Sequence, residues 1–217
     1  MNEITLTKQN YFSSPIYHMY KPEWISDLNN LSDIEIEKAK QRDKAVFDVR
    51  NQKFGKDVGT LGHSFHSYNL SVNQDFAFFN QYVGDRSREI LNEQGYDLSN
   101  HLLAINDCWV QELSQGGHHS PHVHSNNHIS GFYYLKCSDK TSFPIFHDPR
   151  PGKVIIDLPE KDMEKIDDSS SKIYYLPKPG DLYFFNSYLT HEYSFDFGVE
   201  PFRFIHFNIQ AIPRIDV

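Results

Sequence analysis

Apolar residues follow two kinds of spacing, one before and one after residue 100. In residues 72–92 they recur at three- and four-residue intervals, as at Phe76 and Phe79, which predicts an amphipathic helix. Gly95 stands just past the expected end of this helix. Residues 25–49 are more polar and their apolar spacing is weak, so we expect a second helix there that lies at the surface.

The second part of the chain alternates short apolar runs with turn residues. Two short β-like runs, at 3–8 and 14–20, already precede the helical region. In the first of the later runs, Ile105 and Trp109 are expected on one face and Cys108 on the other. Many short strands after a helical region predict a mainly β fold with supporting helices (α+β), either a sandwich or a jelly roll. The predicted later strands are 104–113, 129–137, 141–146, 173–176, 182–185 and 202–212.

The chain of 217 residues is long enough for one hydrophobic core and short for two. We therefore predict a single domain over residues 1–217, with a helix-rich supporting part at 1–100 and a jelly-roll core at 101–217. The net charge of −8 argues against a nucleic-acid partner. No apolar run approaches the roughly 20 residues needed to cross a bilayer, so no membrane partner is expected.

The beginning of the chain and the two cysteines point to one compartment. Residues 1–25 show no basic start followed by an apolar stretch, so no signal peptide is predicted. Cys108 and Cys137 both lie in apolar runs, which favours reduced thiols over a disulfide. Together these features predict a cytoplasmic protein. An aromatic-rich sheet surface makes a homodimer a reasonable expectation.

Histidines concentrate between Gln111 and Leu135, where five of the chain's twelve fall. In a strand, residues i and i+2 point to the same side, so His122 and His124 would place two imidazoles close together. His191 is the best candidate for a third metal ligand. Imidazoles bind a metal only when neutral, so metal affinity is expected to fall below about pH 6.5.

An arginine after the last histidine extends this candidate site. Two imidazoles at i and i+2 with one remote ligand occupy three positions of an octahedral metal and leave three open. The guanidinium of Arg203 would then hold a carboxylate through two parallel hydrogen bonds. This set describes a site for a dicarboxylate that chelates the metal at one end and is clamped at the other.

Several motifs together resemble those of the 2-oxoglutarate/Fe(II)-dependent oxygenases, including prolyl hydroxylases. The resemblance covers roughly residues 105–212. The motifs are Trp109-Val110-Gln111, Gly116 or Gly117 up to His122-Val123-His124, Ser130 to Leu135, Pro177 to Phe184, Leu189-Thr190-His191 and Arg203.

The resemblance implies a cupin-like double-stranded β-helix and Fe(II) and 2-oxoglutarate as cofactors. It implies hydroxylation of a small-molecule or peptidyl substrate, such as an amino-acid side chain, with decarboxylation of 2-oxoglutarate to succinate. By analogy, His122, His124 and His191 hold the iron, while Tyr134 and Arg203 bind the distal carboxylate of the co-substrate. Gln111 would touch the carboxylate near the iron or order a water, or serve as an ordinary polar group of its strand.

Two positions depart from the family pattern. Most members have a carboxylate where this chain has His124, so His124 is either a ligand or a neighbour with water in its place. Many relatives carry Ser or Thr two residues after the arginine, where this chain has Ile205. Two other readings stay open: a cupin-type three-histidine dioxygenase without co-substrate, and a non-catalytic jelly-roll binding module.

Other residues near the motifs have weaker claims to a role. We expect His118, His119 and His128 at the surface or along a pocket and Trp109 in the core. His206 and Asn208 are candidates for supporting contacts. The acidic, Ser-rich segment 157–172 is either a lid over the site or a solvated linker.

Overall fold

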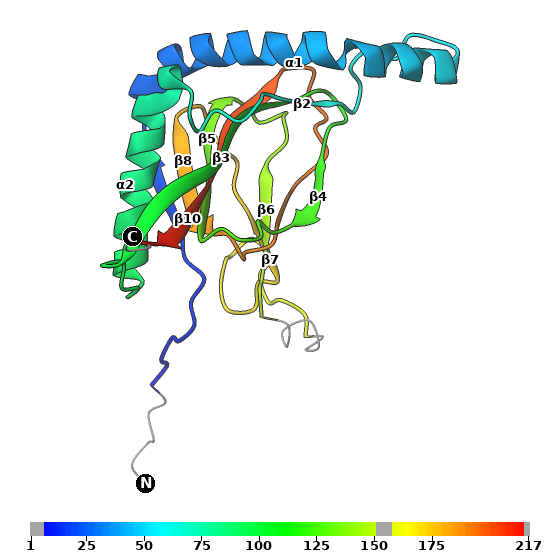
Figure 1. Cartoon of the computed structure of the whole chain (residues 1–217). Coiled ribbons are helices and arrows are strands. Elements are labelled where there is room, and N and C mark those ends of the chain that lie inside the picture. Colours follow the sequence, from blue (N-terminus) through cyan, green and yellow to red (C-terminus); the bar gives the residue numbers. More distant parts are fainter. Residues whose placement is uncertain (1–6, 151–157, 215–217) are drawn as a thin grey trace.

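The structure is a computed structural model that describes residues 7–150 and 158–214. The run predicted at 3–8 therefore lies almost entirely outside the described residues. Two long helices and ten strands make up the described part of the chain (Figure 1). Among these residues, no helix combines the length and apolar character needed to cross a bilayer.

Both predicted helices are present. α2 (Ala77–Glu93) follows a short 3-10 turn at Gln74–Phe76, and its buried side chains include Phe79 and Val83. α1 (Ile25–Phe54) follows a 3-10 turn at Pro22–Trp24 and is longer than predicted. All its buried residues precede position 40, so its second half extends past the sheets, as Figure 1 shows. This explains why the apolar spacing of this helix is weak.

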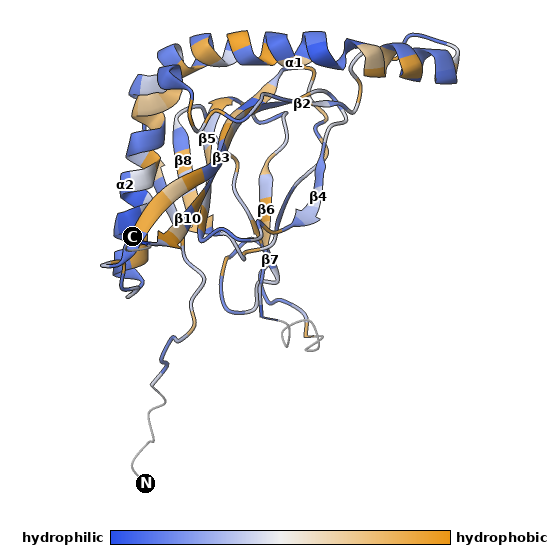
Figure 2. Cartoon of the chain, viewed as in Figure 1, coloured by the Kyte–Doolittle hydropathy of each residue, from blue (hydrophilic) through white to orange (hydrophobic). Residues whose placement is uncertain are grey.

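The large sheet has six antiparallel strands. Their spatial order is β1-β8-β5-β10-β3-β2, so the last strand of the chain lies between two central ones. The six strands of this sheet are β1 Ile16–Tyr20, β2 Ser64–His66, β3 His101–Leu113, β5 Ile129–Lys136, β8 Asp181–Asn186 and β10 Phe202–Pro213. Figure 2 shows that apolar residues concentrate on these central strands, while α1 is mainly hydrophilic.

The small sheet has four antiparallel strands in the order β4-β9-β6-β7. Their bounds are β4 His119–His122, β6 Pro144–His147, β7 Lys172–Tyr174 and β9 His191–Tyr193. The sequence pattern did not predict β4 and β9, because three or four residues are too few for an alternation to show. These two strands pair with each other and bring His122 opposite His191.

The two faces of the large sheet have different partners. One face packs against α1 and α2 and includes Cys108, Ile205 and Phe207. The other faces the small sheet through a second, aromatic cluster that includes Tyr134 and Phe204. Two antiparallel sheets packed face to face, with helices on the outside, form the double-stranded β-helix that the sequence predicts.

One prediction was wrong: Ile105 and Trp109 do not lie on the same face of β3. Ile105 packs on the helix side with Cys108, whereas Trp109 faces the other sheet against His206. The register between β3 and β10 shifts between Asn208 and Ile209, which leaves an extra residue in β3. A bulge of this kind reverses the alternation on one side of it, and no sequence signal marks it here.

Candidate metal centre

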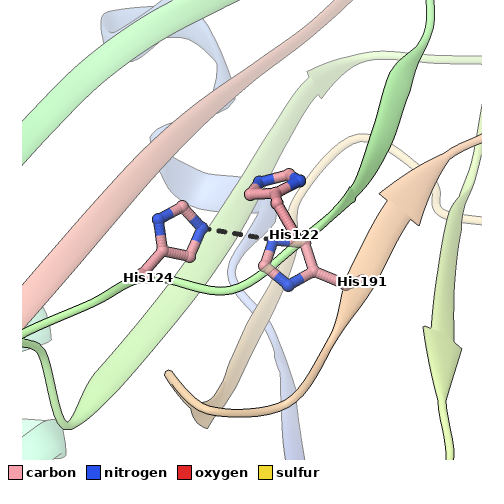
Figure 3. Close-up of side chains that lie close together, drawn as sticks. All are labelled: His122, His124 and His191. Carbon is pink, nitrogen blue, oxygen red and sulfur yellow. Dashed lines mark hydrogen bonds between the residues drawn. The ribbon is translucent and has the colours of Figure 1, made fainter.

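Three histidines converge at one end of the space between the sheets. His122 ends β4, His124 lies two residues beyond the end of that strand, and His191 begins β9. One nitrogen from each lies within 4.8 Å of the others (Figure 3). His191 is buried and the other two are half-buried, so the cluster is open to solvent on one side. The structure therefore brings together the three ligands predicted from the sequence.

Backbone carbonyls orient two of these imidazoles for metal binding. The Nδ1 of His122 lies 2.8 Å from the Ser120 carbonyl oxygen, and the Nδ1 of His191 lies 3.0 Å from that of Leu189. A carbonyl oxygen only accepts, so each Nδ1 carries the proton and donates it. The Nε2 of each neutral ring then carries a lone pair toward the cluster.

The third imidazole is held differently. The Nε2 of His124 lies 3.2 Å from the Nε2 of His191 (Figure 3), close to the roughly 3 Å between two nitrogens that bind one ion at right angles. Since His191 keeps its proton on Nδ1, His124 is the donor in this contact. Its own Nδ1 lies 3.4 Å from the Asn208 amide nitrogen. To bind a metal through Nε2, His124 would have to carry its proton on Nδ1 instead.

Burial lowers the pKa of two of the clustered imidazoles. Desolvation lowers the pKa of His191 to about 3 and that of His124 to about 4. The neighbouring His119 has its pKa lowered to about 4 for the same reason, and the pKa of the fully buried His206 is also well below its usual value. Protonation of His124 and His191, which would weaken metal binding, is therefore expected only at a pH well below 6.5.

Arg203 does not join this cluster. Its neighbours Phe202 and Phe204 belong to the aromatic cluster between the sheets, so the alternation of β10 directs Arg203 to the helix side. There its Nε and Nη2 donate to Glu112 Oε2 at 2.8 and 2.6 Å, and its Nη1 pairs with Asp33 of α1. The guanidinium is thus engaged in a buried ion pair, and its position does not support the predicted role in carboxylate binding.

Tyr134 does face the interior, where its hydroxyl lies 3.0 Å from that of Tyr193. Both rings are fully enclosed, and burial raises the pKa of both hydroxyls well above the usual value. The sequence analysis did not identify Tyr193 as a residue of the site. The alternation His191-Glu192-Tyr193 was the available signal, because it places Tyr193 on the same side of β9 as His191.

Gln111 also faces the interior but lies beside a different histidine. Its Nε2 donates to Ser64 Oγ at 2.8 Å and contacts His119 Nε2, while its Oε1 accepts from Trp109 Nε1. Trp109 itself is half-buried, with its ring 4.3 Å from that of His206. Gln111 therefore borders the histidine cluster through His119.

The remaining candidates lie at the margins of the site. His206 Nε2 and Ser130 Oγ both contact Asn208 Oδ1, which ties His206 and His124 to one amide. His118 is exposed and stacks on Phe195. The described part of the acidic segment, from 158 onward, is mostly exposed, and residues 167–172 line a groove together with residues 8–14.

The fold and the histidine cluster define a metal-binding double-stranded β-helix protein. Residues 107–203, which hold all three histidines, match the family described as "Putative 2OG-Fe(II) oxygenase". This match confirms the resemblance drawn from the motifs: the part of the chain that holds the histidine cluster is similar to the 2-oxoglutarate/Fe(II)-dependent oxygenases. No curated protein matches the chain in sequence.

Solved structures support the same fold at low sequence identity. A Pseudomonas putida prolyl-4-hydroxylase is 13% identical, with 94% of this chain and 95% of that chain covered and a TM-score of 0.51. The viral collagen prolyl hydroxylase of Paramecium Bursaria Chlorella virus-1 is also 13% identical, with 91% and 96% covered and a TM-score of 0.53. HygX of Streptomyces hygroscopicus, with nickel and 2-oxoglutarate bound, is 10% identical, with 91% and 83% covered and a TM-score of 0.52.

The family's two cofactors fit this site unequally. Three convergent imidazoles, two of them with an unprotonated Nε2, fit a divalent metal ion. For the distal carboxylate of 2-oxoglutarate, the interior between the sheets offers the hydroxyls of Tyr134 and Tyr193 but no buried lysine or arginine side chain among the described residues. Among residues 7–150 and 158–214, Arg203 is the only lysine or arginine that is buried, and it faces the helices.

Proposed function

We propose that the protein is an Fe(II)-dependent oxygenase that uses a 2-oxo acid as co-substrate, 2-oxoglutarate in the family, to hydroxylate an amino-acid or peptidyl side chain. The observation that carries this proposal is the convergence of His122, His124 and His191, two of which are protonated on Nδ1 and keep Nε2 for a metal ion. Bound iron with a 2-oxo acid would supply the oxidising chemistry, with oxidative decarboxylation of the acid.

The chain's own contribution is to hold and shield this centre. The carbonyls of Ser120 and Leu189 fix the orientation of two ligands, as hydrogen-bond partners of metal-bound histidines commonly do. The ring of Phe132 lies 5.5 Å from that of His191 and that of Phe185 lies 4.8 Å from it, so one side of the site is dry. Water exclusion protects reactive intermediates from side reactions.

The open side of the cluster is where we place the substrate. His122 and His124 are half-buried there, whereas His191 forms the floor. Two of the similar structures are prolyl hydroxylases, which supports a peptidyl or amino-acid substrate for this chain as well. A single domain with its site in residues 101–217, a homodimer and a cytoplasmic location all stay predictions.

Anaerobic loading with Fe(II), followed by 2-oxoglutarate and oxygen, tests the proposal. We expect iron-dependent formation of succinate, and a mass increase of one oxygen on a hydroxylated peptide from a library screen. His191→Ala should abolish both iron binding and succinate formation, because it removes the buried ligand. His118→Ala is the matched control, since His118 is exposed and stacks only on Phe195.

Two results would decide against the proposal. Full iron binding by His191→Ala would mean that this cluster is not the metal centre. Iron-loaded wild-type protein that never binds a 2-oxo acid would point to a dioxygenase without co-substrate, the alternative that the family match does not favour.

A further inference from the structure

The interior next to the metal centre is aromatic and uncharged. Beyond His191 it is walled by Phe132, Phe202 and Phe204, with the hydroxyls of Tyr134 and Tyr193 as its polar atoms. Tyr193 Cα lies two residues along β9 from His191, roughly 6.5 Å of strand. A five-carbon 2-oxo acid chelated at the histidines and directed inward would therefore end near these two hydroxyls.

This interior is poorly suited to a second negative charge. A buried carboxylate needs a paired cation or several donors to offset its loss of hydration. Arg203, the buried arginine of the described chain, lies on the opposite face of β10, where it pairs with Glu112 of β3. The polar atoms on this side are the hydroxyls of Tyr134 and Tyr193, which carry no positive charge.

The tyrosine pair does not require a charged ligand either. The two hydroxyls lie 3.0 Å apart and one donates to the other, so each has a hydrogen-bond partner without a charged ligand. The surrounding side chains are aromatic rings in contact with one another: those of Tyr193 and Phe204 stack 4.7 Å apart, and that of Phe202 lies 5.5 Å from Phe204.

We infer that this site accepts 2-oxo acids with an uncharged side chain at least as well as it accepts 2-oxoglutarate. The inference rests on the proposed function and specifies its co-substrate class. It follows from the aromatic interior, the self-paired tyrosines and the outward-facing Arg203. The metal would hold the 2-oxo carboxylate end in both cases, so only the distal end distinguishes the two ligands.

Two ligands of matched shape test the inference. In 5-methyl-2-oxohexanoate, two methyl groups replace the two distal carboxylate oxygens of 2-oxoglutarate. Each would be titrated anaerobically into the Fe(II)-loaded full-length protein, and binding followed by the charge-transfer absorption of the chelate and by calorimetry. We expect the methyl compound to bind with equal or higher affinity, and Tyr174→Phe, at an exposed tyrosine, to change neither value.

A second variant reports on the distal end itself. Tyr193→Phe removes one hydroxyl but keeps the ring, and we expect it to improve binding of the methyl compound relative to 2-oxoglutarate by about threefold or more, since one hydrogen bond is lost to the charged end only. Because the affinity of each acid is measured, the result does not depend on catalytic turnover.

The outcomes separate this inference from the proposed function. If 2-oxoglutarate binds about tenfold tighter than the methyl compound, a difference of about 1.4 kcal/mol, the inference is overturned while the oxygenase proposal stands. If neither acid binds the iron-loaded protein, the proposed function falls and the inference falls with it. Equal or tighter binding of the methyl compound supports both.

Discussion

Replacing Arg203 with methionine separates a structural role from a role in co-substrate binding. The guanidinium donates to Glu112 Oε2 at 2.8 and 2.6 Å, and both side chains are almost fully buried, with 4% and 7% exposed. Removing one partner of a buried ion pair costs roughly 3–5 kcal/mol, because the other charge stays buried. Lys40 still pairs with Glu112 Oε1 at 3.0 Å, so the loss should be near the lower end.

We therefore expect Arg203→Met to lower the free energy of unfolding by roughly 3 kcal/mol. With a urea dependence of about 2 kcal/mol per molar, the unfolding midpoint would fall by about 1.5 M. Arg203→Met combined with Glu112→Gln should recover part of this loss, because the unpaired charge is then removed. Arg150→Met, at an exposed ion pair with Asp148, should change stability by no more than about 0.5 kcal/mol.

The same variant should bind 2-oxoglutarate as the wild type does, provided that binding is measured where both are folded. The reasoning would be refuted by an Arg203→Met protein that keeps its unfolding midpoint but binds 2-oxoglutarate tenfold or more weakly. That result would mean that the guanidinium turns into the interior when ligand binds.

Three further predictions follow from other parts of the structure. In the metal-free protein, burial lowers the pKa of His124 to about 4 and that of His191 to about 3, below the ordinary 6.5, so the folded state binds fewer protons than the unfolded state below pH 6.5. Stability should therefore fall as pH drops, by about 2 kcal/mol for each of these histidines at pH 5, and urea unfolding at pH 7.5 and 5 measures it; equal midpoints would contradict it. Saturating Mn(II) should raise the melting temperature of the wild type at pH 7.5 but not that of His191→Ala, as checked by thermal unfolding. Gly131→Ala should destabilise by about 3 kcal/mol or more, since its Cβ would lie 2.2 Å from Phe207 Cζ and 2.3 Å from the Tyr183 carbonyl oxygen, whereas Gly84→Ala, with open space in α2, should stabilise by up to about 1 kcal/mol in the same unfolding assay.

The sequence was sufficient for the fold class and the histidine set because both depend on local signals. Helix spacing predicted α2, apolar runs predicted the central strands, and the i, i+2 spacing of His122 and His124 with the late His191 predicted the cluster. These patterns are visible within short windows of the chain.

The face of β10 on which Arg203 lies depends on residues that are far away along the sequence. Either face of β10 is apolar, since Phe204 lies on one and Ile205 on the other. Periodicity therefore cannot tell which face meets the helices. Asp33 and Glu112, the partners that settle the question, are 170 and 91 residues away along the chain.

The place of β10 has a consequence for how the enzyme is made. This strand is the last of the described chain, yet it pairs with β3 on one side and β5 on the other, at the middle of the large sheet. Until residues 202–213 have emerged from the ribosome, the two halves of that sheet have no common neighbour. Pairings so distant along the chain form slowly, so the large sheet would be completed only after its last strand has been synthesised.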